Sequence, residues 1–247
     1  MNQKENVNSQ LLIFLRGIKS GEVFNVEDFN ATRKLNPSQV SLGLSALVEQ
    51  GLVSRLGKGV YLKAGADTRL SPEDIIRDHI FDSGGNRKGY LTGRAYLVSA
   101  GLAEDYGDRI TVAVAKKRGP VLRGGMTFRF VEQRLPINDN TYELLQLLDA
   151  LRGLNRMHDT VPASKVYEHV SSNVALMSPA RVERIINMAL SYSHMVRALL
   201  GSIIDTTHGI SSAVKLMVSL NCTTVTPVDL SSDVLPNAGP WRLVCRE

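Results

Sequence analysis

Four short polar side chains lie close together in the first quarter of the chain and could hydrogen-bond to DNA bases. They are Ser38, Gln39, Ser41 and Ser45. Base edges in the major groove offer donors and acceptors that hydroxyl and amide groups can match. Lys58, between two glycines, offers a cation of the kind that contacts phosphate. If one helix carries the polar group and a turn carries the lysine, these residue types predict binding to double-stranded DNA.

The segment from Asn36 to Gly51 has the pattern of such a helix. An apolar stripe with spacing i, i+4, i+7 and i+8 must face a core, which leaves the polar residues on the other side. This stripe is Val40, Leu44, Leu47 and Val48. Asn36 or Ser38 can cap the helix around Pro37, and Gly51 can end it in the left-handed conformation. We therefore predict a helix that turns its small polar side chains outward.

A β-hairpin is predicted directly after this helix. Residues 52–55 and 60–63 have the composition of two short strands, and Gly57-Lys58-Gly59 makes the turn between them. A helix followed by a strand, a basic turn and a second strand is typical of a winged helix-turn-helix, whose recognition helix enters the major groove. The alternative interpretation is a winged helix that contacts only protein, because the outward helix face is not strongly basic.

Three further cations complete the predicted DNA-binding surface. Arg33 and Lys34 precede the polar helix, and Arg55 lies in the first strand of the hairpin. Cations beside a recognition helix contact the DNA backbone, where they position the protein without specifying the sequence. For Arg33 and Lys34 a solvated loop is an equally good explanation.

The beginning of the chain supplies the other helices that a winged helix needs. Residues 10–18 predict a first helix with a broad apolar face, and Asn25 can cap a short second helix with two acids in its first turn. Residues 64–67 have the composition of a linker. We therefore predict two domains, a winged helix-turn-helix over residues 1–66 and a larger domain over residues 67–247.

Composition sets the class of protein. The chain has 247 residues and is 43% hydrophobic, which is ample for the cores of two domains. It has no apolar run of about 18 residues and no apolar segment typical of a signal peptide near its start. We expect no membrane association and a cytoplasmic location. Cys222 and Cys245 are too isolated for a disulfide framework or a zinc site, and we expect neither a metal nor a cofactor.

Positive charge is concentrated in two parts of the chain. Residues 1–66 contain eight basic and five acidic side chains, and residues 107–134 contain seven basic and two acidic side chains. The second segment includes Lys116, Lys117, Arg118, Arg123 and Arg129. Nucleic acid is the simplest partner for both segments. For the second segment, a solvated hairpin end is an equally good explanation.

The larger domain is predicted to be of mixed α+β class, with a small sheet and several helices. Residues 109–115 and 126–131 alternate in the manner of strands. Further helices are predicted to begin near residues 71, 92, 141, 164, 178, 195 and 211. Thr92 is the predicted cap of its helix, and the tail with Trp241 is predicted to add a final strand. His79 lies on an apolar helix face and is interpreted as a core residue without chemistry.

No catalytic signature is present in the sequence. It contains no Gly-x-Ser-x-Gly elbow, no phosphate-binding loop and no His-Glu-x-x-His. The nearest candidates are His158-Asp159 and the segment from Asp205 to His208. Adjacency in sequence neither places a nucleophile nor builds an oxyanion site. We therefore predict that the protein is not an enzyme.

Taken together, several segments resemble the AbiEi-type antitoxin and transcriptional regulator family. They are the predicted winged helix over residues 10–63, the segment from Thr92 to Leu102, the strand at residues 110–114 and the strand that contains Arg129. The resemblance covers roughly residues 10–200. It implies that the N-terminal domain binds inverted repeats in its own promoter, and represses a toxin–antitoxin operon, through Ser38, Gln39, Ser41, Ser45 and Lys58.

The same resemblance implies a role for the C-terminal domain. In this family the larger domain is associated with counteracting a nucleotidyltransferase-like toxin encoded next to the antitoxin. The alternative hypothesis is a protein-interaction module that binds and neutralises a cognate toxin directly, with the winged helix used for docking. The residues of a toxin-binding surface do not follow from the resemblance.

Overall fold

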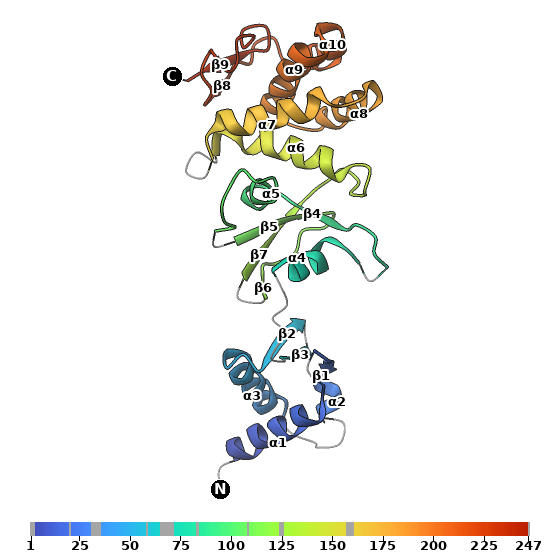
Figure 1. The fold of residues 1–247 in the computed structure, drawn as a ribbon, viewed down its shortest axis with the longest axis vertical. Coiled ribbons are helices and arrows are strands. Elements are labelled where there is room, and N and C mark those ends of the chain that lie inside the picture. Colours follow the sequence, from blue (N-terminus) through green and yellow to red (C-terminus); the bar gives the residue numbers. More distant parts are fainter. Residues whose placement is uncertain are drawn as a thin grey trace. The chain divides into compact units, whose positions relative to one another are not determined.

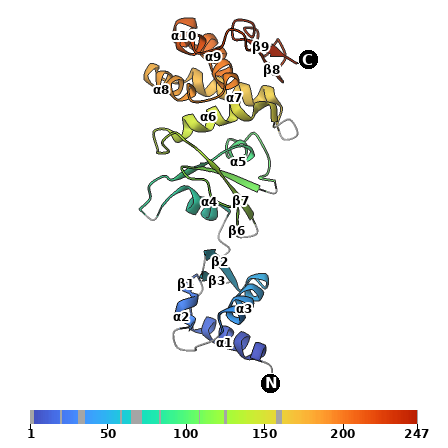
Figure 2. The same cartoon turned by 180° about the vertical axis from the view of Figure 1, so that it is seen from behind.

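The computed structural model describes residues 3–19, 21–30, 36–57, 59–64, 72–82, 84–107, 109–123, 126–156 and 161–246. Within these ranges the protein is of mixed α+β class, as predicted. It divides into two compact units, which Figures 1 and 2 show from opposite sides. Unit 1 comprises Met1–Asp78 and Val121–Met126, and unit 2 comprises His79–Pro120 and Thr127–Glu247. The predicted domain boundary between residues 66 and 67 lies outside the described residues.

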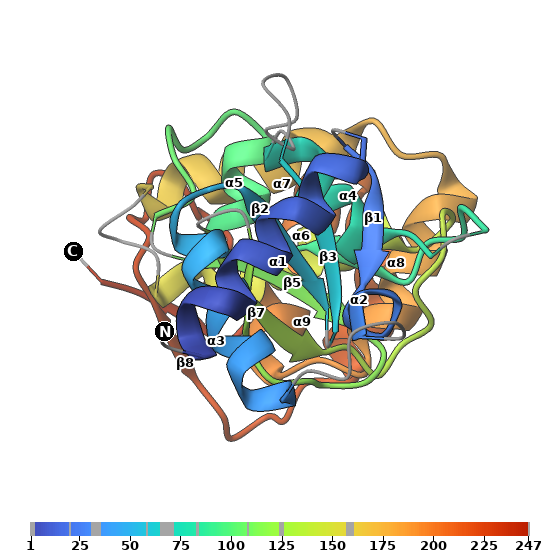
Figure 3. The ribbon, with the colours of Figure 1, turned by 90° about the horizontal axis from the view of Figure 1, so that it is seen from below.

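Up to residue 64, the described part of unit 1 combines three helices with a small sheet. Its elements are α1 (Gln3–Gly17), β1 (Val23–Asn25), α2 (Val26–Asn30), α3 (Pro37–Glu49), β2 (Val53–Gly57) and β3 (Val60–Lys63). The strands pair antiparallel in the order β1-β3-β2. The β2–β3 pair confirms the predicted hairpin, with an irregular register between Arg55 and Gly57. Figure 3 shows α1 and α3 side by side next to these strands.

The first helix begins at Gln3, earlier than the predicted start at Gln10. Val7 lies one turn before Leu11 and two turns before Leu15, and all three side chains are buried, so the apolar stripe extends toward the N-terminus. The rest of the core of unit 1 consists of Phe24, Phe29, Val40, Leu44, Leu47, Val53 and Tyr61. Helix α1 therefore contributes a full face to this core.

Unit 2 combines a small sheet with a larger set of helices. Helix α4 (Pro72–Ile80) spans the division between the units, and the short strand β6 (Val121–Arg123) is grouped with unit 1. The remaining elements are β4 (Gly89–Leu91), α5 (Arg94–Ser99), β5 (Arg109–Val114), β7 (Met126–Glu132), α6 (Tyr142–Gly153), a 3-10 turn (Leu154–Arg156), α7 (Ala163–Ala175), α8 (Pro179–Ala189), α9 (His194–His208), α10 (Ile210–Val218), β8 (Thr226–Val228) and β9 (Leu243–Cys245).

The sheet of unit 2 has a central strand with two kinds of neighbour. Strand β5 pairs antiparallel with β4 and parallel with β7, with Ile110 opposite Phe128 and Val112 opposite Phe130. The two strands predicted around residues 109–115 and 126–131 are confirmed. Strands β5 and β7 run in the same direction and therefore do not form a hairpin with each other. Strand β6 is the other neighbour of β7 in the sheet, and the glycine turn at residues 124–125 lies outside the described residues, so a hairpin end there stays an interpretation. Alternation identifies a strand but not the direction of its neighbour.

Helices α6 to α10 stack on one side of this sheet (Figures 1 and 2). Helix α9 is central to the stack, and its residues 198–204 are all buried. The tail returns to α9 and buries Trp241 completely against Gly201, where an added Cβ would lie 2.0 Å from Trp241 Cζ3. Strands β8 and β9 pair in parallel, so the predicted final strand is present together with a partner.

Candidate functional site

Helix α3 is held by the local signals that its sequence contains. The backbone N–H of Ser38 donates to Asn36 Oδ1 at 3.0 Å, which assigns the cap to Asn36 rather than Ser38. Pro37 occupies the start of the helix, where its missing N–H is not needed. Gly51 follows the helix with a φ of 70°, the left-handed conformation that was predicted there.

The outward face of α3 is a row of serines beside one exposed leucine. Ser38, Ser41 and Ser45 are all exposed. Positions 38, 41, 42 and 45 lie on one side of a helix with 3.6 residues per turn. Ser45 Oγ donates to the backbone oxygen of Ser41 at 3.0 Å, and Leu42 is 63% exposed. This face is small, weakly charged and able to hydrogen-bond.

Two residues of α3 lie differently from their predicted places. Gln39 is only half-exposed and lines a hollow of about 160 Å³ with Val7 of α1, so it lies on the flank of the serine row. Val48 was predicted in the buried stripe, but it is 37% exposed. Gly43 is buried instead, because α1 approaches it closely: an added Cβ would meet Leu11 Cδ1 at 2.6 Å.

The predicted cations of unit 1 are described only in part. Arg55 is exposed on β2, and its Nε donates to the Gly57 carbonyl at 3.3 Å, next to the hairpin turn. Arg33, Lys34 and Lys58 lie outside the described residues. The structure therefore brings three of the predicted serines onto one face and leaves the contribution of these three cations as a prediction.

A basic cavity of about 380 Å³ opens beside β5 and β7 in unit 2. Its cationic lining consists of Arg109, Lys117, Arg118 and Arg129, and no acid lines it among the described residues. Three of these side chains belong to the predicted second basic patch, and Arg109 is an addition. Lys116 is exposed but does not line the cavity, and the side chain of Arg123 lies outside the described part of the chain.

Arg118 is anchored within this basic cavity. Its guanidinium lies 3.7 Å from the centroid of the Phe130 ring and 3.2 Å from His79 Nδ1. Arginine can only donate, so His79 Nδ1 accepts this hydrogen bond. Burial lowers the pKa of Arg118. His79 is buried, with its ring centroid 4.3 Å from that of Phe128, which confirms its predicted place in the core.

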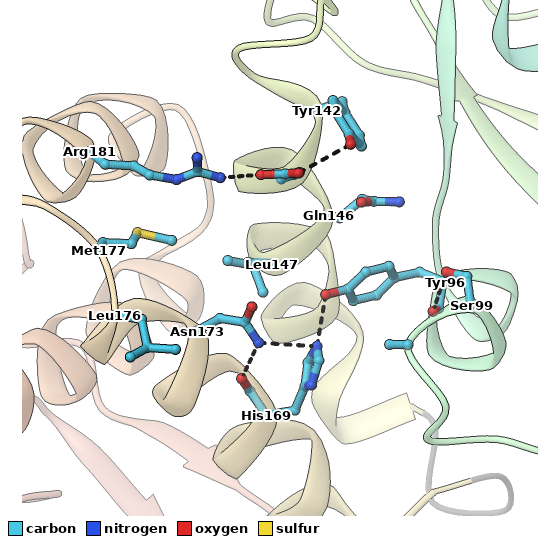
Figure 4. A pocket seen from close by; sticks show the side chains of 12 residues that line it. Tyr96, Ser99, Tyr142, Gln146, Leu147, His169, Asn173, Leu176, Met177 and Arg181 are labelled. Carbon is cyan, nitrogen blue, oxygen red and sulfur yellow. Dashed lines mark hydrogen bonds and ion pairs between the residues drawn. The ribbon is translucent and has the colours of Figure 1, made fainter.

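A second cavity, of about 490 Å³, is lined by α5, α6, α7 and the start of α8, and we call it the α6 cleft (Figure 4). On one side of the cleft, the Tyr96 hydroxyl lies 2.9 Å from His169 Nε2. On the other side, Arg181 donates to the Glu143 carboxylate, which also accepts a hydrogen bond of 3.1 Å from the Tyr142 hydroxyl. Sequence reasoning missed this cleft, since its residues come from segments far apart in the chain.

The ionisation states in the α6 cleft follow from burial and hydrogen bonding. Burial lowers the pKa of His169 and raises the pKa of Tyr96 to about 12, so both groups are neutral near pH 7. Asn173 Nδ2 lies 3.5 Å from His169 Nε2 and can only donate, so Nε2 is the acceptor and the Tyr96 hydroxyl donates to it. The hydrogen bond from Arg181 lowers the pKa of Glu143, which stays a carboxylate.

A buried carboxylate, Asp149 on α6, forms a third polar group. It is 3% exposed, accepts hydrogen bonds from Tyr90 at 2.9 Å, Thr92 at 2.9 Å and Tyr192 at 3.0 Å, and forms an ion pair with Arg152 at 3.0 Å. Helix α5 begins after Gly93, so the prediction of Thr92 as a helix cap is wrong. The Thr92 hydroxyl donates its hydrogen bond to Asp149 instead. Because side chains of the protein itself supply all of these partners, we interpret Asp149 as a structural residue.

Of the two candidates considered for catalysis in the sequence, the structure describes the segment from Asp205 to His208. Asp205 accepts from Trp241 Nε1 at 3.1 Å and from Asn237 at 3.0 Å. His208 Nε2 lies 2.9 Å from the carbonyl oxygen of Val174. These partners connect α9 to the tail and to α7. His158 and Asp159 lie outside the described residues.

Two further observations concern ligands and membranes. Within the described ranges, no three His, Cys, Asp or Glu side chains come together in a way that could hold a metal ion. No described helix has both the length and the apolar character needed to cross a bilayer. Cys222 and Cys245 are free thiols.

Comparison of the sequence with protein-family models and with curated proteins finds no match. Among solved structures, the crystal structure of RV2827C protein from Mycobacterium tuberculosis is similar, with a TM-score of 0.49 and 16% sequence identity. The similarity covers 98% of this chain and 92% of that chain.

Proposed function

We propose that the protein is a sequence-specific DNA-binding transcription regulator and that unit 1 is its winged helix-turn-helix. The observation that carries this proposal is α3 with its exposed row of Ser38, Ser41 and Ser45, followed directly by the β2–β3 hairpin. Short hydroxyl side chains let a helix approach base edges closely in the major groove. The methyl groups of exposed Leu42 suit contact with the methyl group of thymine.

Cations outside α3 would supply affinity rather than specificity. Arg55 lies exposed next to the hairpin turn, and four cations surround the basic cavity of unit 2 without an acid among the described residues. Contacts of this kind neutralise phosphates and release counterions, so their contribution falls as the salt concentration rises. We propose that the basic cavity also contacts the nucleic-acid backbone.

We further propose that the regulator is a cytoplasmic antitoxin that represses its own toxin–antitoxin operon through inverted repeats in its promoter. Unit 2 would counteract a nucleotidyltransferase-like toxin. The support is the resemblance of residues 10–200 to the AbiEi-type family. This finer role depends on the DNA binding proposed for unit 1, but the DNA binding does not depend on the antitoxin role.

A direct protein-binding role for unit 2 is the second candidate function. Ile210, Val214 and Val218 follow one another at intervals of four residues along α10 and are 47%, 47% and 79% exposed. A row of exposed apolar side chains on one helix face is a feature of protein-interaction surfaces. This observation favours direct contact with a toxin as the alternative to regulation alone.

The test of the DNA-binding proposal is the variant Ser41→Asp. A carboxylate on the outward face of α3 would meet phosphates and base acceptors, so we expect affinity for the upstream DNA of the gene to fall by at least about 100-fold. The matched control is Ser212→Asp, an exposed serine on α10 of unit 2, which should change affinity by less than about twofold. Equal affinity of the two variants for upstream DNA would contradict the proposal.

A further inference from the structure

We propose that the α6 cleft binds an uncharged nucleoside whose base carries an exocyclic amine, such as adenosine or cytidine. The inference is independent of the DNA binding proposed for unit 1. It rests on the hydrogen-bonding groups of the cleft, on its balance of charge and on its apolar floor.

Two amide side chains present oxygen acceptors in the cleft. Gln146 Nε2 donates to the Leu91 carbonyl at 3.0 Å, and Asn173 Nδ2 donates to the backbone oxygen of His169 at 2.8 Å. Figure 4 shows the Asn173 oxygen on the side of the amide away from His169. Each amide nitrogen is turned toward a protein acceptor, so the oxygen of each amide is left as an acceptor for a ligand. Adenine and cytosine carry an amino group that can donate to such oxygens, whereas uracil has none.

The Glu143 carboxylate adds a third acceptor. Carboxylates commonly accept hydrogen bonds from ribose hydroxyls. Arg181 neutralises Glu143, and no other charged side chain lines the cleft among the described residues, since His169 is neutral. The cleft therefore holds no net charge for a phosphate to bind, which favours a nucleoside over a nucleotide.

The floor of the cleft suits the flat face of a base. Leu147 and Met177 are 4% and 8% exposed and line the cavity. In Figure 4, Leu147 lies next to the Tyr96 and His169 rings, and Met177 lies farther along the cavity toward Arg181. Flipped or free bases are held between aromatic and apolar side chains in this manner. A cavity of about 490 Å³ lies within the usual range of small-molecule sites, about 300–1,000 Å³.

The test is isothermal titration calorimetry of the full-length protein with adenosine, cytidine, uridine and AMP at millimolar concentration. We expect adenosine or cytidine to bind, uridine to bind about tenfold more weakly, and AMP to bind no more tightly than adenosine. The absence of binding by both amino nucleosides would overturn the proposal. Uridine binding as tightly as cytidine, or AMP binding more tightly than adenosine, would overturn it too.

Two variants and a control test whether the nucleoside binds in the α6 cleft. Gln146→Met keeps the length of the side chain but removes the amide oxygen, and it should weaken nucleoside binding about tenfold. Glu143→Gln releases exposed Arg181 from its acid, so the affinity for AMP should rise relative to that for adenosine. The control Glu183→Gln changes another exposed acid, on α8 outside the cleft, and should leave both affinities unchanged. Unaltered binding in Gln146→Met and an unaltered AMP-to-adenosine ratio in Glu143→Gln would place the ligand elsewhere and refute the assignment.

Discussion

Asn36 determines where α3 begins, because its side chain satisfies a backbone N–H that the first helical turn leaves without a partner. We predict that Asn36→Ala lowers the free energy of unfolding by about 1 kcal/mol. Asn36→Asp retains a hydrogen-bond acceptor, so its free energy of unfolding should stay within a few tenths of a kcal/mol of that of the original protein. Urea unfolding followed by circular dichroism measures both variants. Equal stability of Asn36→Ala and the original protein would show that the cap contributes nothing.

His169 makes stability depend on pH. Burial lowers its pKa in the folded protein, whereas the unfolded chain has a pKa near 6.5. Below about pH 6.5 the unfolded state therefore binds more protons, so the stabilisation is complete above this pH and is lost as the pH falls. His194 has a pKa lowered in the same direction by burial.

We therefore predict that the free energy of unfolding decreases between about pH 7.5 and about pH 5.5. His169→Gln should show a smaller decrease, with the remainder due to His194. Urea unfolding of the original protein and of His169→Gln at both pH values measures the two decreases. The same pH dependence in His169→Gln as in the original protein would rule out His169 as a source of this effect.

At the scale of elements, Trp241 attaches the tail to α9. Gly201 leaves the space that the indole fills, and the indole N–H donates to Asp205 at 3.1 Å. Gly201→Ala should displace the ring and lower the free energy of unfolding by about 3 kcal/mol. The control is Gly239→Ala in the same tail, where an added Cβ would meet nothing within 4 Å. If thermal and urea unfolding showed equal losses in both variants, the account of this contact would be wrong.

Elements with complete local signals were predictable from the sequence. The apolar stripe, Pro37 and Gly51 together predict α3 because each acts within a few residues of the helix. The flank position of Gln39 depends on how closely α1 approaches Gly43, and no local pattern contains that distance. Val48 continues the apolar stripe in sequence, but it is 37% exposed.

Features that depend on distant parts of the chain were not predictable. The parallel pairing of β5 with β7 is set by the fold and leaves no trace in the alternation of either strand. Thr92 resembles a helix cap in sequence, but it lies next to Asp149, which is 57 residues away in the chain. The α6 cleft likewise requires α5 to α8 to pack together before His169 and Glu143 line one cavity.

For the whole molecule, the proposed DNA binding assigns sequence specificity to unit 1. Both units would supply affinity through cations that contact phosphates. Arg129 is exposed on β7 and lines the basic cavity. We predict that Arg129→Ala weakens binding to upstream and shuffled duplexes by the same factor and reduces the salt dependence by about one phosphate contact. Titrations over a range of salt concentrations measure this effect. A loss confined to the upstream duplex would instead indicate that Arg129 reads bases.

The most direct test of the central claim is fluorescence anisotropy of the full-length protein with its own upstream DNA and with a shuffled duplex, at two salt concentrations. We predict tight binding to the upstream DNA and weak binding to the shuffled duplex that declines further at the higher salt concentration. Weak and equal binding to the two duplexes would contradict sequence-specific recognition by α3 and would favour a protein-docking role for unit 1.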